Sequence, residues 1–273
     1  MPRITANGIG FEYELFGEPT APPMLLVMGY SAQMIQWEDD FCGDLASKGF
    51  HVCRFDNRDV GLSDKLDEQD GYPLSAMTDD LEAIIVALGF GPAHLVGLAS
   101  GGMIAQDLAA RPGSPVASLC VINSTPCLAL SMPTDAIREV FLAPRPDGRQ
   151  AYVDHMAGVR RLLASPAYWD ERAVREMAGR LYDRCYYPAG MERQMAAIIG
   201  SPDLRAALAQ VTCPTLVIHG RLDPLTPLVG GEMSAAAIPD ADLLVIGGMG
   251  HDLARPLWRR IVPAIAGNAR RAL

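Results

Sequence analysis

Three short segments of this 273-residue chain carry residue types that together suit nucleophilic attack on a carbonyl group. Residues 97–101 read Gly-Leu-Ala-Ser-Gly, between an apolar run and a segment with helical periodicity. This spacing is typical of a tight strand-to-helix turn that presents a nucleophile at its apex, because the residues two positions before and after the apex must be small. Asp223 and His251 follow later in the chain. The order of turn, acid and histidine predicts the catalytic triad of an acyl-transfer site.

The apex of this turn is Ala99, which has no oxygen with which to attack a carbonyl. The alternative register puts Ser100 at the apex, but Leu98 would then crowd a position that must be small. We therefore favour residue 99 as the nucleophile position. A natural loss of function would give no reason to retain Asp223 and His251 together with the glycines. The sequence is thus best interpreted as an engineered Ser→Ala variant, inactive in hydrolysis. A Ser100 side chain that faces His251 at hydrogen-bonding distance would support the alternative register.

The acid and the base are expected where two later apolar runs end. Asp223 follows residues 214–220, so its carboxylate should lie at the C-terminal end of a strand, where it would orient a histidine and stabilise its charged form. The structural alternative is that Asp223 caps the turn before the next helix. His251 lies in the glycine-rich segment 247–252, which suits a general base. The remaining histidines are interpreted as packing or surface residues: His51, His94, His155 and His219.

The elements that must position these residues alternate along the chain. A hairpin is predicted over residues 3–16, with its turn at Asn7-Gly8. Short runs that are apolar throughout then predict strands buried on both faces, at residues 23–29, 50–56, 93–97, 117–123, 214–220 and 242–247. Helical periodicity lies between them, at residues 74–88, 100–110 and 252–267. The alternation predicts an α/β fold with a mostly parallel eight-stranded sheet, helices on both faces and a ligand site beyond the C-terminal strand ends.

One stretch interrupts the alternation. Between about residues 126 and 209 no strand is predicted, and helical segments lie near residues 134–142, 148–164, 170–185 and 189–199. We therefore expect a core domain of residues 1–125 and 210–273, with a helical lid, or cap subdomain, of residues 126–209 inserted after the sixth strand. Methionine and aromatic side chains of this lid could line an apolar pocket, although ordinary packing is the better interpretation of each one.

Several segments resemble the α/β-hydrolase fold superfamily. The stretches LLVMG, FDNRDVGLSD and GGMGHDL are most similar to the aclacinomycin methylesterase-like esterase branch, whose members have a helical lid. The matching motifs keep the family's order over nearly the whole chain, at residues 23–30, 54–63, 95–106, 214–224 and 247–252. The resemblance implies serine at the position that Ala99 occupies. It also implies that the charged segment 56–63 fixes a loop near the site through ion pairs.

The same resemblance indicates an oxyanion hole made of two backbone N–H groups. One is that of Ser100, directly after the nucleophile position, and the other is that of Tyr30, directly after Gly29. Relatives commonly have a His-Gly pair where this chain has Met28-Gly29. Backbone donors tolerate this change, which leaves Met28 as an apolar wall of the site.

Together these features predict a serine hydrolase that cleaves a carboxylic ester or lactone of a bulky apolar small molecule through an acyl-enzyme. Two alternatives of other classes stay open. One is a non-hydrolytic small-molecule binding protein or receptor of the same fold. The other is an enzyme that uses only the His251–Asp223 dyad, such as a cofactor-free oxygenase or a lyase. Dehalogenase and epoxide hydrolase chemistry is disfavoured, because both need a carboxylate at position 99.

Composition excludes several other classes. A net charge of −9 and a pI near 5.0 argue against a nucleic-acid partner. No apolar run approaches the ~20 residues of a membrane span, and the N-terminus has no signal-peptide core, so a cytoplasmic protein without a membrane partner is expected. The six cysteines show no metal-binding spacing, and no phosphate or dinucleotide motif is present, so neither a metal nor a cofactor is expected. A homodimer is compatible with the sequence.

Overall fold

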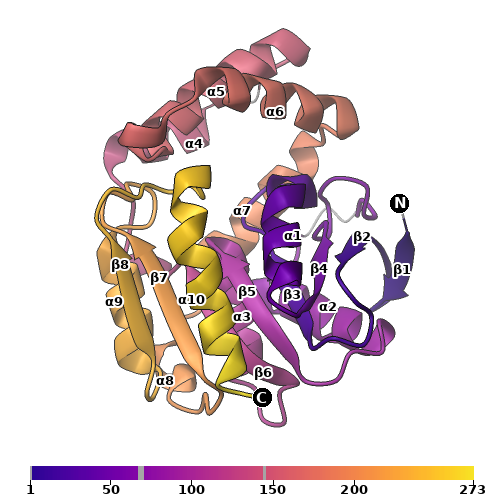
Figure 1. Cartoon of the computed structure of the whole chain (residues 1–273). Helices are drawn as coiled ribbons and strands as arrows, with labels where there is room; N and C mark the ends of the chain where they lie inside the picture. The colour runs from indigo at the N-terminus through magenta and orange to yellow at the C-terminus, as the bar shows by residue number, and fades with distance from the viewer. Residues whose placement is uncertain (1, 67–70, 144–145) are drawn as a thin grey trace.

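A twisted eight-stranded sheet forms the centre of the computed structural model, which describes residues 2–66, 71–143 and 146–273 (Figure 1). The strands lie in the order β1-β2-β4-β3-β5-β6-β7-β8. Their bounds are Arg3–Ala6 (β1), Ile9–Phe16 (β2), Pro23–Val27 (β3), His51–Phe55 (β4), Ala93–Leu98 (β5), Val116–Ile122 (β6), Thr215–Gly220 (β7) and Asp242–Ile246 (β8). Strand β2 pairs antiparallel with β1 and β4, and the other neighbours are parallel. The predicted fold class is therefore confirmed.

The predicted hairpin at the start of the chain is also confirmed. Strands β1 and β2 pair in register from Ala6 and Ile9 outward. Asn7 and Gly8 make the turn with φ values of 49° and 75°. Both residues tolerate this left-handed conformation, which matches the twist of the two strands.

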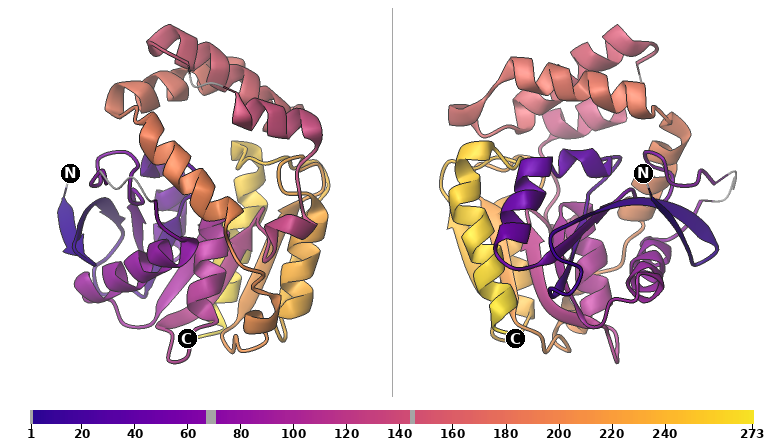
Figure 2. Two further views of the ribbon diagram at one scale, coloured as in Figure 1. Left: turned by 180° about the vertical axis from the view of Figure 1, so that it is seen from behind. Right: turned by 45° about the vertical axis from the view of Figure 1, so that its right-hand side comes forward.

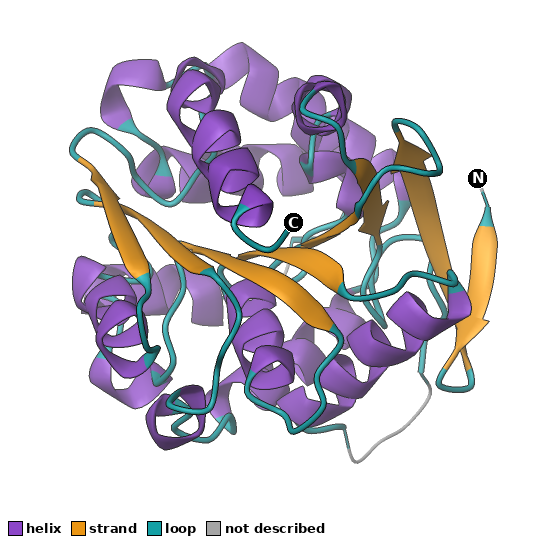
Figure 3. Cartoon of the chain, turned by 60° about the horizontal axis from the view of Figure 1, so that its bottom comes forward, coloured by secondary structure: helices purple, strands orange, loops and turns teal. Residues whose placement is uncertain are grey.

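Helices cover both faces of the sheet (Figure 3). Alternate residues of the parallel strands bury in opposite layers, as the continuous apolar runs require. Leu25 and Val27 of β3 pack with α2 (Leu74–Ala87) and α3 (Ser100–Ala109). Met24 and Leu26 pack instead with α1 (Asp39–Ser47) and α10 (Trp258–Arg270). The short helix α8 (Arg205–Leu208) and helix α9 (Leu228–Ala237) complete the first layer.

Helix α10 begins later than the sequence predicts. A helix was expected from residue 252, but a 3-10 turn, η4 (Arg255–Leu257), comes first and α10 starts at Trp258. Pro256 lies at the first turn of η4, where a missing N–H is tolerated. Residues 247–254 are therefore free of helix and form a loop that reaches over the end of the sheet.

No helix in the described part of the chain is long and apolar enough to cross a membrane.

Most of the helices between β6 and β7 form a separate layer above the C-terminal ends of the strands, whereas α8 lies with the core (Figures 1 and 2). We call residues 126–209 the helical insert; its main helices are α4 (Asp135–Leu142), α5 (Arg149–Leu163), α6 (Glu171–Arg184) and α7 (Pro188–Ile199). Its own apolar cluster joins Tyr152 and Leu181 to Met34 of the core, which belongs to the 3-10 turn η1 (Met34–Gln36). The rings of Tyr152, Tyr182 and Tyr186 contact one another within this cluster. These aromatic side chains are thus packed among themselves.

Buried ion pairs attach the helical insert to the core. Asp56 and Asp59, which follow β4, have fully buried side chains. Asp56 pairs with Arg184 at the end of α6 at 2.7 Å, and Asp59 pairs with Arg193 of α7 at 2.7 Å. The neighbouring Arg58 pairs with Asp80 of α2 at 2.5 Å. The predicted ion pairs of the segment 56–63 are therefore confirmed, and they dock two insert helices.

We expect Asp59→Asn to lower the free energy of unfolding by about 3 kcal/mol, because it leaves the Arg193 guanidinium without its buried partner. Burial alone would raise the pKa of Asp59, but hydrogen bonds from Arg193 and from the Leu66 N–H outweigh it and lower that pKa. The pair therefore stabilises the fold above about pH 4 and is lost as the pH falls further. Urea denaturation at several pH values measures both effects.

The matched control for this prediction is Asp203→Asn, because Asp203 pairs with Arg205 on the surface. Water screens that pair, so we expect no measurable change. Equal stability of the Asp59→Asn variant and the parent at neutral pH would contradict the prediction.

Candidate active site

The turn between β5 and α3 has residue 99 at its apex. Ala99 has φ 53° and ψ −123°, a left-handed conformation that is strained for a residue with a side chain. A Cβ added to Gly97 would lie 2.4 Å from the Gly101 carbonyl oxygen, and one added to Gly101 would lie 2.1 Å from that of Val27. Only glycine fits at these two positions, as the nucleophile turn requires. Ser100 is the first residue of α3, and it forms no hydrogen bond to His251 within the described chain.

The predicted acid and base are in direct contact. The Nδ1 of His251 lies 2.6 Å from Oδ2 of Asp223. The other carboxylate oxygen, Oδ1, accepts hydrogen bonds from the backbone N–H groups of Leu225 and Thr226, each at 2.9 Å. The Asp223 side chain is fully buried. Because both of its oxygens are engaged, the carboxylate can turn neither away from the ring nor toward water. It holds the proton of His251 on Nδ1, which leaves Nε2 as the basic nitrogen.

A second histidine lies behind the acid. His219 is completely buried at the end of β7, and its Nε2–H donates to the Thr226 carbonyl oxygen at 2.8 Å. Burial lowers the pKa of His219, so this ring is neutral at physiological pH. Its Nε2 lies 3.8 Å from Oδ2 of Asp223, beyond hydrogen-bonding distance. His219 is therefore a packing residue, as predicted, and it supports the turn that holds the acid.

Asn123 links the acid and base segments to the turn at Ala99. It follows β6 with φ 47° and is fully buried. Its Nδ2 donates to the Gly250 carbonyl oxygen at 3.0 Å, and its Oδ1 accepts from the Gly220 N–H at 2.8 Å. The preceding residue, Ile122, accepts a hydrogen bond from the Ala99 N–H at 2.9 Å. One strand end therefore fixes all three segments of the predicted triad. Asn123 was not predicted from the sequence.

The loop after β3, residues 28–32, packs directly against the turn at residue 99; we call it the β3 loop. A Cβ added to Gly29 would lie 3.0 Å from the Ala99 Cβ and 2.9 Å from the Leu98 carbonyl oxygen. The N–H of Ser100 opens α3 and has no hydrogen-bond partner among the described residues. This N–H lies at a helix N-terminus, which attracts negative charge. The position thus suits the stabilisation of an oxyanion.

Two side chains hold the β3 loop from opposite sides. Asn57 of the core donates from Nδ2 to the Met28 carbonyl oxygen at 2.9 Å. Gln194 of α7 accepts the Ser31 N–H on its Oε1 at 2.8 Å and donates from Nε2 to the Arg58 carbonyl oxygen at 2.9 Å. Gln194 is almost fully buried, and Ser31 has φ 54°, so the loop is held in an unusual conformation.

The helical insert also contacts the loop that carries the base, residues 247–252, which we call the histidine loop. The His251 N–H donates to the Leu163 carbonyl oxygen at the end of α5, at 2.7 Å. The Gly250 N–H donates to Oγ of Ser165 at 2.9 Å. The Ser165 N–H in turn donates to Oδ1 of Asp252 at 3.1 Å. The insert therefore fixes the backbone of Gly250 and His251 and the side chain of Asp252. These residues were missed because most of their partners are backbone groups, which leave no pattern in the sequence.

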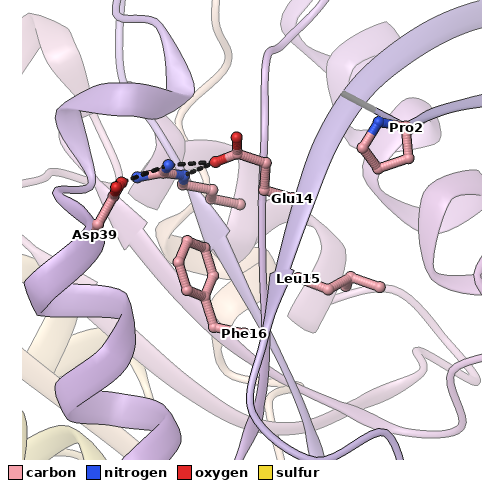
Figure 4. Close-up of a pocket in the computed structure, with 6 residues that line it drawn as sticks. Pro2, Glu14, Leu15, Phe16 and Asp39 are labelled. Carbon is pink, nitrogen blue, oxygen red and sulfur yellow. Dashed lines mark hydrogen bonds and ion pairs between the residues drawn. The ribbon is translucent and has the colours of Figure 1, made fainter.

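Two hollows lie outside the triad. An open surface hollow of about 450 Å³ is lined by residues of β2, β4 and α1, among them Arg54, which pairs with Glu14 and Asp39 (Figure 4). None of the predicted site residues lines it. A cavity of about 20 Å³ lies between the β3 loop and the insert, and its lining includes Ser31 and Tyr187. Among the described residues, no group of histidine, cysteine and acidic side chains is arranged to hold a metal ion.

A family model described as the alpha/beta hydrolase fold matches residues 22–254 of the chain, which include the turn at Ala99, Asp223 and His251. The chain belongs to the α/β-hydrolase fold family. This confirms the family to which the sequence motifs pointed.

Its curated relatives include esterases and other hydrolases. This α/β-hydrolase is 28% identical to rhodomycin D methylesterases of Streptomyces sp. (strain C5) and Streptomyces peucetius, and each match covers 98% of both chains. Among solved structures, an enol-lactonase from Burkholderia xenovorans superposes with a TM-score of 0.78 at 22% identity, over 99% of both chains. A serine-to-alanine mutant of a meta-cleavage product hydrolase from Pseudomonas fluorescens gives a TM-score of 0.82 at 22% identity, over 100% of this chain and 98% of that one. The methylesterase relatives agree with the resemblance seen in the motifs.

We expect Asn123→Leu to lower the free energy of unfolding by about 2 kcal/mol, because Gly220 N–H and the Gly250 carbonyl lose their buried partner. It should also displace the histidine loop. The downfield proton resonance of His251 Nδ1–H, recorded by NMR, should shift or broaden in this variant.

Asn268→Leu is the matched control, since Asn268 donates to the carbonyl oxygens of Leu119, in the middle of β6, and Pro214, directly before β7. This change should destabilise the fold to a similar extent and leave the His251 resonance in place. The same His251 spectrum in both variants would show that Asn123 does not position the base.

Proposed function

We propose that this α/β-hydrolase is a carboxylic ester hydrolase in which alanine has replaced the nucleophilic serine at position 99. The observation that carries the proposal is the contact between His251 and Asp223, with both oxygens of the buried carboxylate engaged. That geometry orients the imidazole so that Nε2 can accept a proton. A base of this kind serves acyl transfer when a hydroxyl lies beside it, and the strained apex at residue 99 is where such a hydroxyl would lie.

In the serine form, the proposed cycle is as follows. His251 removes the proton of the serine hydroxyl, whose oxygen attacks the ester carbonyl. The N–H groups of Tyr30 and Ser100 hold the tetrahedral oxyanion, and His251 then gives its proton to the leaving alcohol. Water, activated by the same histidine, releases the acid from the acyl-enzyme. Asp223 stabilises the imidazolium in both halves of the cycle.

The conformation of Ala99 supports the interpretation that this position once held serine. A left-handed apex between glycines stores strain, and an alanine side chain gains nothing from it. The structural neighbour from Pseudomonas fluorescens was solved as a serine-to-alanine mutant, so that fold tolerates such an exchange. We accordingly propose an engineered Ser→Ala change, which removes the attacking oxygen and leaves the rest of the site in place.

The proposed substrate is an ester or lactone of a bulky, largely apolar small molecule, with Met28 contributing an apolar wall. Relatives named as rhodomycin D methylesterases and a structural neighbour named as an enol-lactonase support this class. We further propose that the helical insert, residues 126–209, acts as a lid over the core of residues 1–125 and 210–273. The ring of Phe141 in α4 lies 6.1 Å from that of Tyr30, which brings the insert over the β3 loop.

One alternative has a specific observation in its favour. The His251–Asp223 dyad is complete without a nucleophile, and this is the arrangement that a cofactor-free oxygenase or a lyase of the same fold would use. A binding protein without turnover is the third possibility. Substantial turnover by the chain as it stands would favour the dyad enzyme. Tight binding of a small ligand, with no hydrolysis by the Ala99→Ser variant, would favour the receptor.

We expect Ala99→Ser to raise the hydrolysis of p-nitrophenyl esters by at least about 10³-fold over the present chain, because it restores the attacking oxygen. Release of p-nitrophenol gives kcat and KM directly. Adding His251→Ala or Asp223→Asn should remove most of this gain. A well-folded serine variant with no gain in hydrolysis would rule out the proposed mechanism.

The adjacent hydroxyl provides the control for the register of the turn. Ser100→Ala, introduced into the Ala99→Ser variant, should keep most of the activity, since only the backbone N–H of residue 100 takes part. A complete loss in this double variant would instead identify Ser100 as the nucleophile.

We expect Gln194→Leu in the Ala99→Ser variant to lower kcat about tenfold and to change KM less than twofold. The Ser31 N–H would lose its acceptor, and the neighbouring Tyr30 N–H would then be less well aligned with the oxyanion. Gln194→Glu keeps an acceptor for Ser31 and should recover part of kcat. Arg193→Gln, one residue away, weakens the docking of α7 without touching the β3 loop. If it lowers kcat as much as Gln194→Leu does, the effect comes from docking and not from the loop.

A further inference from the structure

One arginine on the buried face of α5 has no acidic partner. Val153, Ala157 and Leu163 are buried, and Arg160 follows Ala157 by three residues and precedes Leu163 by three, so it lies on the same face of the helix. All residues of α5 are described, and Arg160 is the one charged side chain on this face.

The surroundings of Arg160 differ from those of the other arginines that join insert and core. Arg184 and Arg193 each pair with a buried carboxylate. Arg160 donates from Nη2 to the neutral side-chain oxygen of Gln36, and it makes no ion pair with any described carboxylate. The Arg160 side chain is half-buried, and this burial lowers its pKa although Tyr152 and Asp252 offset part of the effect. Apart from the bond to Gln36, no described residue accepts from the five N–H donors of this guanidinium, which leaves the others open to a ligand.

Three observations place Arg160 near segments of the proposed site. Gln36 ends η1, the turn that follows the β3 loop. Leu163, one helical turn beyond Arg160, accepts the N–H of His251. Asp252, next to His251, is near enough to raise the pKa of Arg160, although the backbone N–H of Ser165 donates to that carboxylate and the two groups form no ion pair. Arg160 thus lies between the segment after the β3 loop and the histidine loop.

We propose that Arg160 is a specificity-determining residue that binds an acidic group of the substrate. This proposal rests on the proposed function and narrows its substrate class. The substrate would be an ester or lactone with a largely apolar body that carries a free carboxylate in addition to the bond that is cleaved. A guanidinium offers two parallel N–H groups to the two oxygens of a carboxylate, and it binds most strongly where water is excluded.

The lack of an ionic partner for Arg160 favours a role in binding over a role in folding. A charge that is partly removed from water without an ionic partner adds little to the stability of a fold, whereas a carboxylate ligand would pair with it. Arg161, the next residue, gives the contrast, because it is exposed and lies over the ring of Trp169. Arg161 thus carries the same charge on the exposed face of α5.

Matched pairs of esters test the proposal in the Ala99→Ser variant. The two esters of a pair have the same acyl chain length, and one of them ends in a free carboxylate. The pairs are 4-nitrophenyl butanoate with mono-4-nitrophenyl succinate, 4-nitrophenyl pentanoate with mono-4-nitrophenyl glutarate, and 4-nitrophenyl hexanoate with mono-4-nitrophenyl adipate. We expect Arg160→Gln to lower kcat/KM at least about tenfold for the acidic member of one pair or more, mainly through KM. The neutral members should change less than twofold. Arg160→Lys should recover part of the loss, and Arg161→Gln should change neither ester.

The outcomes of this assay separate the possibilities. A loss confined to acidic esters supports the proposal. Equal losses for both members of every pair, or no loss in any pair, would overturn it. A serine variant that hydrolyses neither kind of ester would instead be a failure of the proposed function, and the binding measurement below then decides about Arg160 alone.

Binding and stability are measured on the chain with Ala99, where no turnover is needed. Calorimetric titration with glutarate and with adipate should show binding that Arg160→Gln weakens at least about tenfold and Arg161→Gln leaves unchanged. Thermal unfolding of Arg160→Gln should occur at the same or a higher temperature than that of the parent, whereas Arg184→Gln should unfold earlier. Absence of Arg160-dependent binding of either dicarboxylate, or a clear destabilisation by Arg160→Gln, would show a structural role and overturn the proposal.

Discussion

The close approach of β5, α3 and β3 is the constraint on which the rest of the site depends. The backbone at Gly97 and Gly101 lies so near its neighbours that no side chain fits at either position. The chain must therefore pass from strand to helix within one residue, and this forces Ala99 into its left-handed conformation. The other segments are placed relative to this point. Gly29 lies against Ala99, and the end of β6 bonds to the Ala99 N–H and then, through Asn123, to the segments of the acid and the base.

The helical insert is attached by polar contacts whose geometry admits one arrangement. Buried pairs such as Asp56–Arg184 and Asp59–Arg193 add little net stability, because both charges must leave water. The hydrogen bonds within these ion pairs are directional, so they nevertheless fix one position of α6 and α7 on the core. An apolar contact alone would allow the two helices to shift along the core. Gln194 depends on that position, since its two hydrogen bonds reach the β3 loop and Arg58 only when α7 is seated.

Much of this organisation could be predicted from the sequence, and what could not has a physical cause. Continuous apolar runs located β3 to β8, and the spacing of glycines around Ala99 located the turn, because both patterns follow directly from backbone sterics. Asp223 and His251 were identified from their positions after strands. Helices α1 and α9 were not predicted; α9 contains Gly230 and Gly231, which weaken helical periodicity. Asn123 and Gln194 were missed because their hydrogen bonds run to backbone groups far away in the chain, and any sequence offers those. Ser165 was missed because its partners Gly250 and Asp252 are distant in the sequence.

The hydrogen bond from His251 N–H to the Leu163 carbonyl oxygen has a consequence for timing. If the insert swings away to admit a substrate, this bond breaks or the histidine loop is pulled along. When the insert is open, His251 would then be displaced from its position in the proposed site. Entry and proton transfer would belong to different conformations of the same chain. In the proposed enzyme, such an interlock would keep bulk water from being activated while the site is exposed, and turnover would begin only after the insert has closed.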